Sequence, residues 1–257
     1  MRKISLYTLV IGLLSVIQVN YAQGQKDSIK HSMHFSGSLG ITNNGFSIIP
    51  SFSFDQSAAI ILLSWKKQQF SIDPEFRVTP SGKKGSILLW FRYHAIQGKR
   101  FSLRVGAHPA VNWFPSTITQ NGRSEEMIRL RRFLAWELAP SYRVAKNWSA
   151  SLYYLQGNGM QQSGPQTTHF VNLNTTVSNI PVSASLYLTV TPAVYYLYLD
   201  GKDGKFFTAT ASLGSTNHPF VFQGAINQEI SSNIPGTKAF MWNVGVAYIF
   251  RKVLHND

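Results

Sequence analysis

The chain has 257 residues, of which only 14% are charged and 13% are aromatic. Ordinary soluble domains carry about 25% charged residues, so this composition argues against a soluble domain and favours a chain with one face in lipid. Lys and Arg outnumber Asp and Glu by 24 to 11, which gives a net charge of +13. The sequence has no cysteine, which excludes a disulfide scaffold and a lipoprotein anchor.

The first residues have the layout of a secretory signal peptide. Residues 1–3 include two basic side chains, residues 4–17 are mainly apolar, and residues 18–22 are more polar. The alternative is a membrane anchor, but the apolar run is shorter than the roughly 20 residues that a spanning helix needs. We predict a signal peptide over residues 1–22. The exact cleavage site stays open, because Asn20 is not the small residue expected before the cut.

The rest of the chain alternates apolar and polar side chains with a period of two, which is the pattern of β-strands. In one clear example, Phe70, Ile72 and Phe76 alternate with Ser71, Asp73 and Glu75. Most of these runs are long enough to cross a bilayer when tilted. We predict strands over residues 46–54, 58–65, 69–78, 86–96, 101–113, 126–144, 148–156, 167–177, 182–198, 206–213, 220–230 and 240–250.

Short and long connections alternate along the chain. Residues 66–69, 97–99, 145–147 and 178–181 read as tight turns, and residues 80–85, 114–125, 157–166, 200–205 and 231–238 as longer polar loops. Outer-membrane barrels have this rhythm, with short turns in the periplasm and longer loops outside. We therefore predict an all-β fold, a transmembrane antiparallel up-and-down β-barrel in the outer membrane.

The strand count decides how the domain is divided. If residues 31–41 also crossed the membrane, the total would be thirteen, whereas bacterial single-chain barrels have even numbers of strands. We therefore expect an N-terminal extension over 23–41, a barrel of twelve strands over 42–250, and a C-terminal tail over 251–257. Ten or fourteen strands are the alternatives.

The strand phase assigns a group of charged side chains to the lumen. A hairpin around residues 97–99 would place Arg92 opposite Arg104, and like charges that face each other are destabilising. The carboxylates of Asp73 or Glu75 on one side and of Glu137 on the other are placed to offset this repulsion. A structural network and a selectivity strip lining a pore are both open interpretations. The expected lumen ladder comprises Asp73, Glu75, Arg77, Arg92, His94, Arg104, His108, Arg129, Arg131 and Glu137. The opposite wall is expected to carry Asn172, Asn174, Ser183, Ser185, Tyr187, Thr189, Thr208 and Thr210.

The sequence contains no motif of a known barrel enzyme. The His-x-Ser-Asn-Gly type of motif is absent, and His31, His169 and His218 lie apart without metal-ligand spacing. We predict no catalytic residue, no metal and no cofactor. Basic residues of the loops, such as Lys83, Lys84, Lys202 and Lys205, are expected to face outer-membrane lipid and lipopolysaccharide. Nucleic acid is not an expected partner.

The end of the chain resembles the C-terminal signal of outer-membrane barrels. Apolar residues alternate up to an aromatic one: Phe240, Trp242, Val244, Val246, Tyr248 and Phe250. This resemblance implies the barrel assembly machinery as a partner, although seven more residues follow Phe250. Residues 21–23, 40–45, 73–76 and 137–142 resemble an uncharacterised outer-membrane β-barrel family of Bacteroidetes-type bacteria. That resemblance implies fold and location but no activity.

The function expected from these features is that of a small passive pore, or of a barrel that contacts solutes or lipids. A structural or interaction barrel with a side-chain-plugged lumen is the alternative. A lipid-modifying enzyme is the least favoured of the three.

Overall fold

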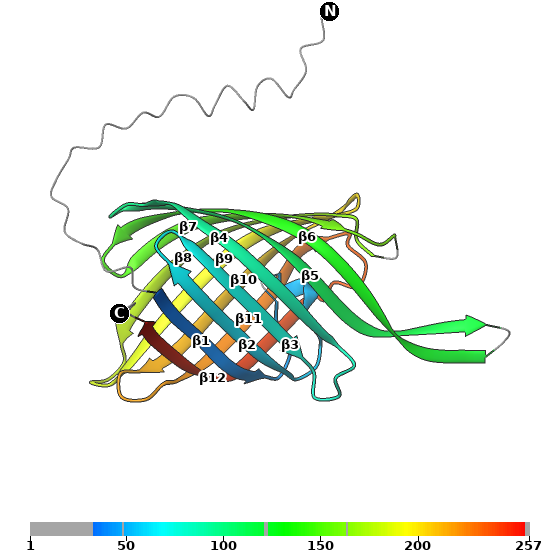
Figure 1. The fold of residues 1–257 in the computed structure, drawn as a ribbon, viewed down its shortest axis with the longest axis horizontal. Coiled ribbons are helices and arrows are strands. Elements are labelled where there is room, and N and C mark those ends of the chain that lie inside the picture. Colours follow the sequence, from blue (N-terminus) through cyan, green and yellow to red (C-terminus); the bar gives the residue numbers. More distant parts are fainter. Residues whose placement is uncertain (1–32, 48, 121–122, 163, 255–257) are drawn as a thin grey trace, which may run out of the picture. The chain divides into compact units, whose positions relative to one another are not determined.

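The computed structural model describes residues 33–47, 49–120, 123–162 and 164–254. Twelve strands form one closed barrel, in which each strand pairs antiparallel with its neighbours in the chain and β1 pairs with β12 (Figure 1). The strands are β1 (Met33–Thr42), β2 (Ala58–Lys67), β3 (Phe70–Val78), β4 (Gly85–Gln97), β5 (Phe101–Gln120), β6 (Arg123–Ala145), β7 (Trp148–Gly159), β8 (Thr167–Pro181), β9 (Leu186–Leu199), β10 (Lys202–Ser215), β11 (Phe220–Ser232) and β12 (Phe240–Leu254). No helix in the described residues is long and apolar enough to span a membrane.

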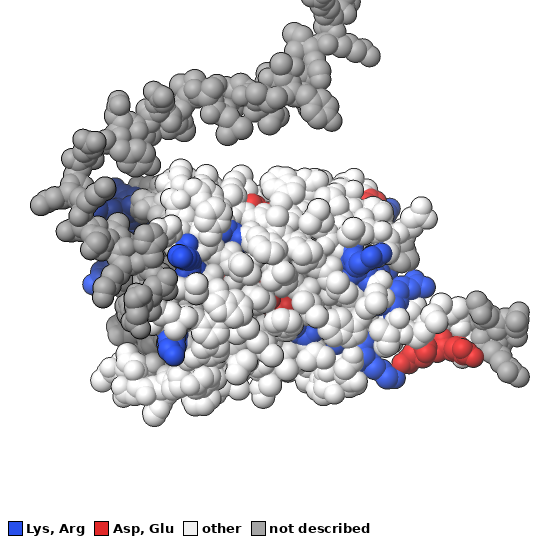
Figure 2. Space-filling view, in the orientation of Figure 1, with Lys and Arg blue, Asp and Glu red and all other residues white. Residues whose placement is uncertain are grey.

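The outer face of the barrel is apolar. Large hydrophobic side chains with more than a third of their surface exposed occur on every strand except β10, among them Leu39, Phe70, Leu173 and Val194. Figure 2 shows that the visible outer face carries few charged side chains, and that these gather toward the two ends. Such a surface is stable against lipid and not against water. The chain is thus an integral membrane β-barrel of the outer-membrane type.

The two ends of the barrel have different connections. At one end lie the start of β1, the end of β12 and the short connectors 68–69, 98–100, 146–147, 182–185 and 216–219, and we call this the turn end. At the other end lie the connectors 43–57, 79–84, 160–166 and 233–239, and we call this the loop end. Short turns on the side of the termini are the arrangement of outer-membrane barrels, in which that side faces the periplasm.

Two of the expected long loops are shorter than predicted. The connector expected over 200–205 is a turn at 200–201, because β10 begins at Lys202. The loop expected over 114–125 is largely strand: β5 and β6 continue past their other neighbours and pair only with each other, from Phe114 with Arg129 to Gln120 with Arg123. This hairpin projects beyond the loop end (Figure 1).

The predicted barrel boundaries are wrong at both ends. Residues 33–42, expected in an N-terminal extension, form β1 and close the barrel between β12 and β2. Residues 46–54, expected as the first strand, instead form part of the loop-end connector, with a short 3₁₀ turn at Pro50–Phe52. Pro50 has no backbone N–H to donate to a strand ladder, which favours the turn. The C-terminal strand also continues beyond 250, since Arg251–Leu254 pair with β1. The predicted signal peptide lies outside the described residues.

The count of twelve strands is nevertheless confirmed, because β1 replaces the segment 46–54. An apolar cluster fills part of the lumen. Its members are buried side chains from strands β4 and β6–β10 and from two loop-end connectors: Ile49, Trp90, Ala135, Tyr153, Leu155, Phe170, Tyr195, Leu197, Phe206 and Ile234. Strands β8–β10 also carry polar inward side chains at other levels, such as Asn172 and Thr208.

Candidate functional site: the lumen of the barrel

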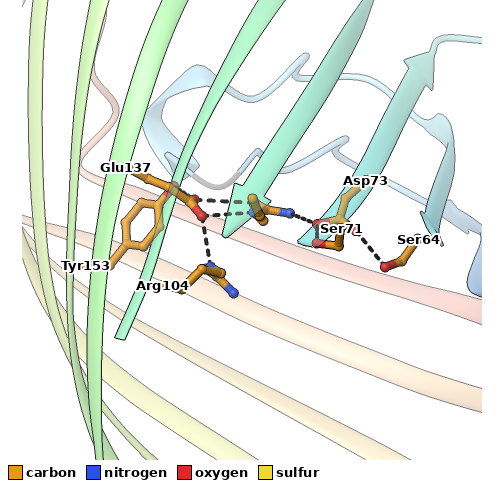
Figure 3. Close-up of polar contacts among 7 residues, drawn as sticks. Ser64, Ser71, Asp73, Arg104, Glu137 and Tyr153 are labelled. Atoms are coloured by element: carbon orange, nitrogen blue, oxygen red, sulfur yellow. Dashed lines mark hydrogen bonds and ion pairs between the residues drawn. The ribbon is translucent and has the colours of Figure 1, made fainter. Parts of the chain in front are cut away.

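Arg92 on β4 is the centre of a charged network in the lumen. Its Nε donates to Glu137 Oε1 at 2.8 Å, and its Nη1 donates to Asp73 Oδ2 at 2.9 Å. Arg104 on β5 donates its own Nε to the same Glu137 oxygen at 2.8 Å. Figure 3 shows Glu137 and Arg104 on one side of the network and Asp73 on the other. Two carboxylates therefore face two guanidinium groups, and their formal charges cancel.

Neutral side chains donate further hydrogen bonds to the two carboxylates. Glu137 is only 1% exposed and also accepts a hydrogen bond from the Tyr153 hydroxyl at 2.8 Å. Asp73 accepts from the hydroxyls of Ser64 and Ser71 at 2.5 and 2.9 Å. Buried charges are tolerated only when they are paired and hydrogen-bonded in this way. Both carboxylates of the network are therefore paired and hydrogen-bonded within the wall.

Sequence reasoning missed these neutral partners, together with Trp90, whose ring lies 4.2 Å from the guanidinium carbon of Arg92. Strand phase could have found Ser64, Ser71 and Tyr153, because they alternate on the inward side of β2, β3 and β7. Trp90 has the same inward phase as Arg92, two residues away, but its apolar character obscured the alternation there.

The predicted pairing of Arg92 with Arg104 is wrong. Arg92 lies opposite Gly106, and Arg104 lies opposite His94, because the turn is centred at 98–100 and β4 has an irregularity between His94 and Ile96. Gly106 gives the room for this close approach. A Cβ there would lie 3.0 Å from Arg92 Cγ and 3.1 Å from Glu137 Oε1, which is closer than ordinary contact. The glycine lets Arg92 cross over β5 and reach Glu137 on β6.

Glu75 and Arg77 on β3 form a separate ion pair. Arg77 Nη2 lies 2.5 Å from Glu75 Oε1, and both side chains are largely buried. Both residues line a cavity of about 540 Å³ in the lumen. Arg77 Nε has no hydrogen-bond partner among the described residues. Glu75 pairs with Arg77 and not with Arg92. Of the two carboxylates expected to neutralise Arg92 on this side, Asp73 is the one that does so.

The other members of the expected ladder form no hydrogen bond to the network, although His94 and His108 lie beside it. His94 carries no side-chain hydrogen bond among those of the described residues, and His108 is buried with its ring 4.0 Å from that of Trp90. Arg129 lies on the projecting hairpin, and Arg131 lies at the loop-end rim, where its guanidinium is 4.4 Å from the Phe114 ring. The prediction that Arg129 lines the lumen is wrong, because β6 has already passed β7 at this point.

The expected polar wall is only partly present in the cavity. Asn172, Asn174, Thr208 and Thr210 line it, as predicted from strand phase. Ser183 and Ser185 instead belong to the connector between β8 and β9, and Tyr187 and Thr189 lie at the turn end of β9, so these four residues are not part of the lining. Within the described residues, no group of three or more His, Cys, Asp or Glu side chains could hold a metal ion.

Comparison with solved structures returns outer-membrane barrels. The COG4313 outer membrane channel from Pseudomonas putida F1 is 10% identical, with 89% of this chain and 100% of that chain covered and a TM-score of 0.48. The NanC porin is 11% identical, covering 83% and 98%, with a TM-score of 0.48. LpxR from Salmonella typhimurium is 11% identical, covering 84% and 100%, with a TM-score of 0.44. No family model and no curated protein matches the chain, so membership of the Bacteroidetes-type family stays a prediction.

Proposed function

We propose that this outer-membrane barrel is a narrow passive pore for small polar solutes. The observation that carries the proposal is the cavity of about 540 Å³, which keeps part of the lumen free of side chains. Barrels of eight strands are just wide enough to be filled by their own side chains, so a barrel of twelve has room to spare. Here that room lies on the side of β1–β3 and β8–β12.

Small side chains line much of this sector. The inward positions of β1 are Ser36, Ser38, Gly40 and Thr42, and those of β12 include Asn243 and Gly245. On β8–β10, which carry both, the aromatic cluster lies nearer the loop end than the residues that line the cavity. The proposed path is therefore narrow, which supports passage of small solutes and exclusion of large ones.

The balanced charges support weak ion selectivity. Arg92 and Arg104 are neutralised by Asp73 and Glu137, and Arg77 is neutralised by Glu75. Selective pores use rings of one sign of charge. The interpretation of the ladder as a selectivity strip is accordingly less well supported than its interpretation as a wall network.

A tryptophan placed in the path tests the pore. Ser38 lines the cavity, and its neighbour Leu39 points to lipid with 47% of its surface exposed. We expect Ser38→Trp to reduce single-channel conductance in a planar bilayer strongly, because the indole would fill the open sector. Leu39→Trp is the matched control and should conduct like the unmodified chain. Equal conductance of the two variants would contradict a path along β1.

A plugged barrel is the second candidate, favoured by the apolar cluster and by the burial of Ile49 and Ile234 from two loop-end connectors. Such a barrel would act through its loops. If the folded, unmodified chain shows neither conductance nor swelling of solute-loaded liposomes, the cluster closes the lumen and the second candidate holds.

Contacts with the membrane belong to the same proposal. Lys83 and Lys84 already have partners within the chain, Glu126 and the carbonyl of Phe54, so Lys202 and Lys205 are better placed to meet phosphorylated lipid. Recognition of β12 by the barrel assembly machinery is proposed from its sequence. That the chain is not an enzyme stays a prediction, since a fold does not decide activity.

A further inference from the structure

The lumen cavity has two chemically different walls. One wall carries amide and hydroxyl side chains of β8 and β10, namely Asn172, Asn174, Thr208, Thr210 and Ser212. The other carries Phe46, Pro50, Ile60 and Leu62, from the first loop-end connector and β2. In the closed barrel β2 and β8 are six strands apart in both directions, so they lie opposite each other.

The polar wall has unused hydrogen-bonding atoms. Asn174 Nδ2 donates to Asn172 Oδ1 at 3.0 Å, and this bond orients both amides. The described residues provide no partner for Asn172 Nδ2 or Asn174 Oδ1, nor for the hydroxyls of Thr210 and Ser212. The cavity is thus faced by one free donor (Asn172 Nδ2), one free acceptor (Asn174 Oδ1) and two free hydroxyls, each of which can donate or accept.

A buried donor on β3 adds a second observation. Arg77 is only 8% exposed and lines the cavity, and its Nε has no hydrogen-bond partner among the described residues. Buried donors are normally satisfied, so this nitrogen is free to donate to an acceptor in the cavity. Because Glu75 already balances the charge of Arg77, the acceptor has no need to be an anion.

We propose that the cavity is a binding site for an uncharged, hydroxyl-rich solute of the sugar class, held between the amide wall and the apolar wall. Hydroxyl groups of the solute match the free atoms of Asn172, Asn174 and Thr210 and accept from Arg77. Its C–H face packs on Ile60 and Leu62. A charged solute would lose its hydration without gaining a counter-ion, which is unfavourable. The inference deepens the proposed pore by naming its solute class.

Binding can be measured without conduction. Saturation-transfer NMR on the barrel in lipid nanodiscs would compare glucose with gluconate and glucosamine, which have nearly the same size but carry a charge. We expect saturation transfer to glucose and much less to either charged compound. A pore that conducts but shows no transfer to glucose would overturn the binding site alone. Transfer without conductance would overturn the pore and support the site.

A pair of variants locates the site. Replacing both Asn172 and Asn174 by Leu keeps the branched shape and the number of heavy atoms and removes the polar atoms, and we expect glucose binding to weaken by about fivefold for each hydrogen bond lost. Asn112→Leu on β5, which is not part of the cavity lining, is the matched control. Heat-modifiable migration would check the fold of both proteins. Equal weakening in the two proteins, or none in either, would place binding outside this cavity.

Discussion

Glu137 accepts hydrogen bonds from Arg92, Arg104 and Tyr153 while its side chain is fully buried. The arrangement depends on a glycine, since any Cβ at position 106 would press on both Arg92 and Glu137. A charge in such a place is stable only as long as every partner is present, because the low dielectric of the wall magnifies an unpaired charge. The network therefore ties the register of β3–β6 together.

Removing the charge of Glu137 tests this at the residue scale. Glu137→Gln leaves two guanidinium groups with Asp73 as their carboxylate, and we expect a loss of about 3 kcal/mol in the free energy of unfolding. Glu126→Gln is the control, because its ion pair with Lys83 is exposed on both sides and should contribute less than about 1 kcal/mol. Urea unfolding in lipid bilayers, followed by tryptophan fluorescence, measures both. Similar losses would show that the network does not stabilise the wall.

At the scale of a single strand, alternation decides which solvent each side chain meets. On β8, Leu173 is 56% exposed on the outer face, and the adjacent Asn174 lines the cavity. The same rule explains why β1 crosses the membrane. Phe35, Leu39 and Ile41 face outward, Ser36, Ser38 and Gly40 face inward, and the strand is bonded on both edges. Residues 46–54 lack such a pair of neighbours and turn into the lumen instead.

Adjacent arginine substitutions on β8 test the two faces. We expect Leu173→Arg to cost about 2–4 kcal/mol, the range for Arg near the middle of the lipid face of a barrel. Asn174→Arg should be much milder, because water in the cavity solvates the guanidinium. Folding yield into liposomes, read from heat-modifiable migration, compares the two. The opposite ranking would reverse the strand phase of β8.

At the scale of the whole molecule, the antiparallel order places both ends of the barrel chain on one side. The start of β1 and the end of β12 lie at the turn end, together with the five connectors that follow β2, β4, β6, β8 and β10. In an antiparallel barrel with an even number of strands, the first strand begins and the last strand ends on the same side. The asymmetry between short turns and longer loops predicts the direction in the membrane, with the projecting β5–β6 hairpin outside. Lys83 in the connector 79–84 and Lys99 in the connector 98–100 lie at opposite ends.

Cysteine labelling tests this orientation. The protein gives no background labelling, because the sequence has no cysteine of its own. We expect Lys83→Cys to react with a membrane-impermeant maleimide in intact cells. Lys99→Cys should react only after the outer membrane has been permeabilised. Both positions are exposed, so accessibility within the fold does not differ between them. Labelling of Lys99→Cys alone in intact cells would invert the barrel.

By itself the sequence determined the barrel class, the antiparallel order and the inward phase of Asp73, Arg92 and Glu137. These follow from a period of two, which is a local property of each strand. Only the tertiary structure decided which segment closes the barrel, which residue faces Arg92, and which part of the lumen is filled. A pattern of period two is unchanged when a strand slides by two residues, so the register follows from turns, irregularities and pairing partners. Filling of the lumen depends on side chains such as Ile49, Phe170 and Arg77, which meet only after distant strands have closed around them.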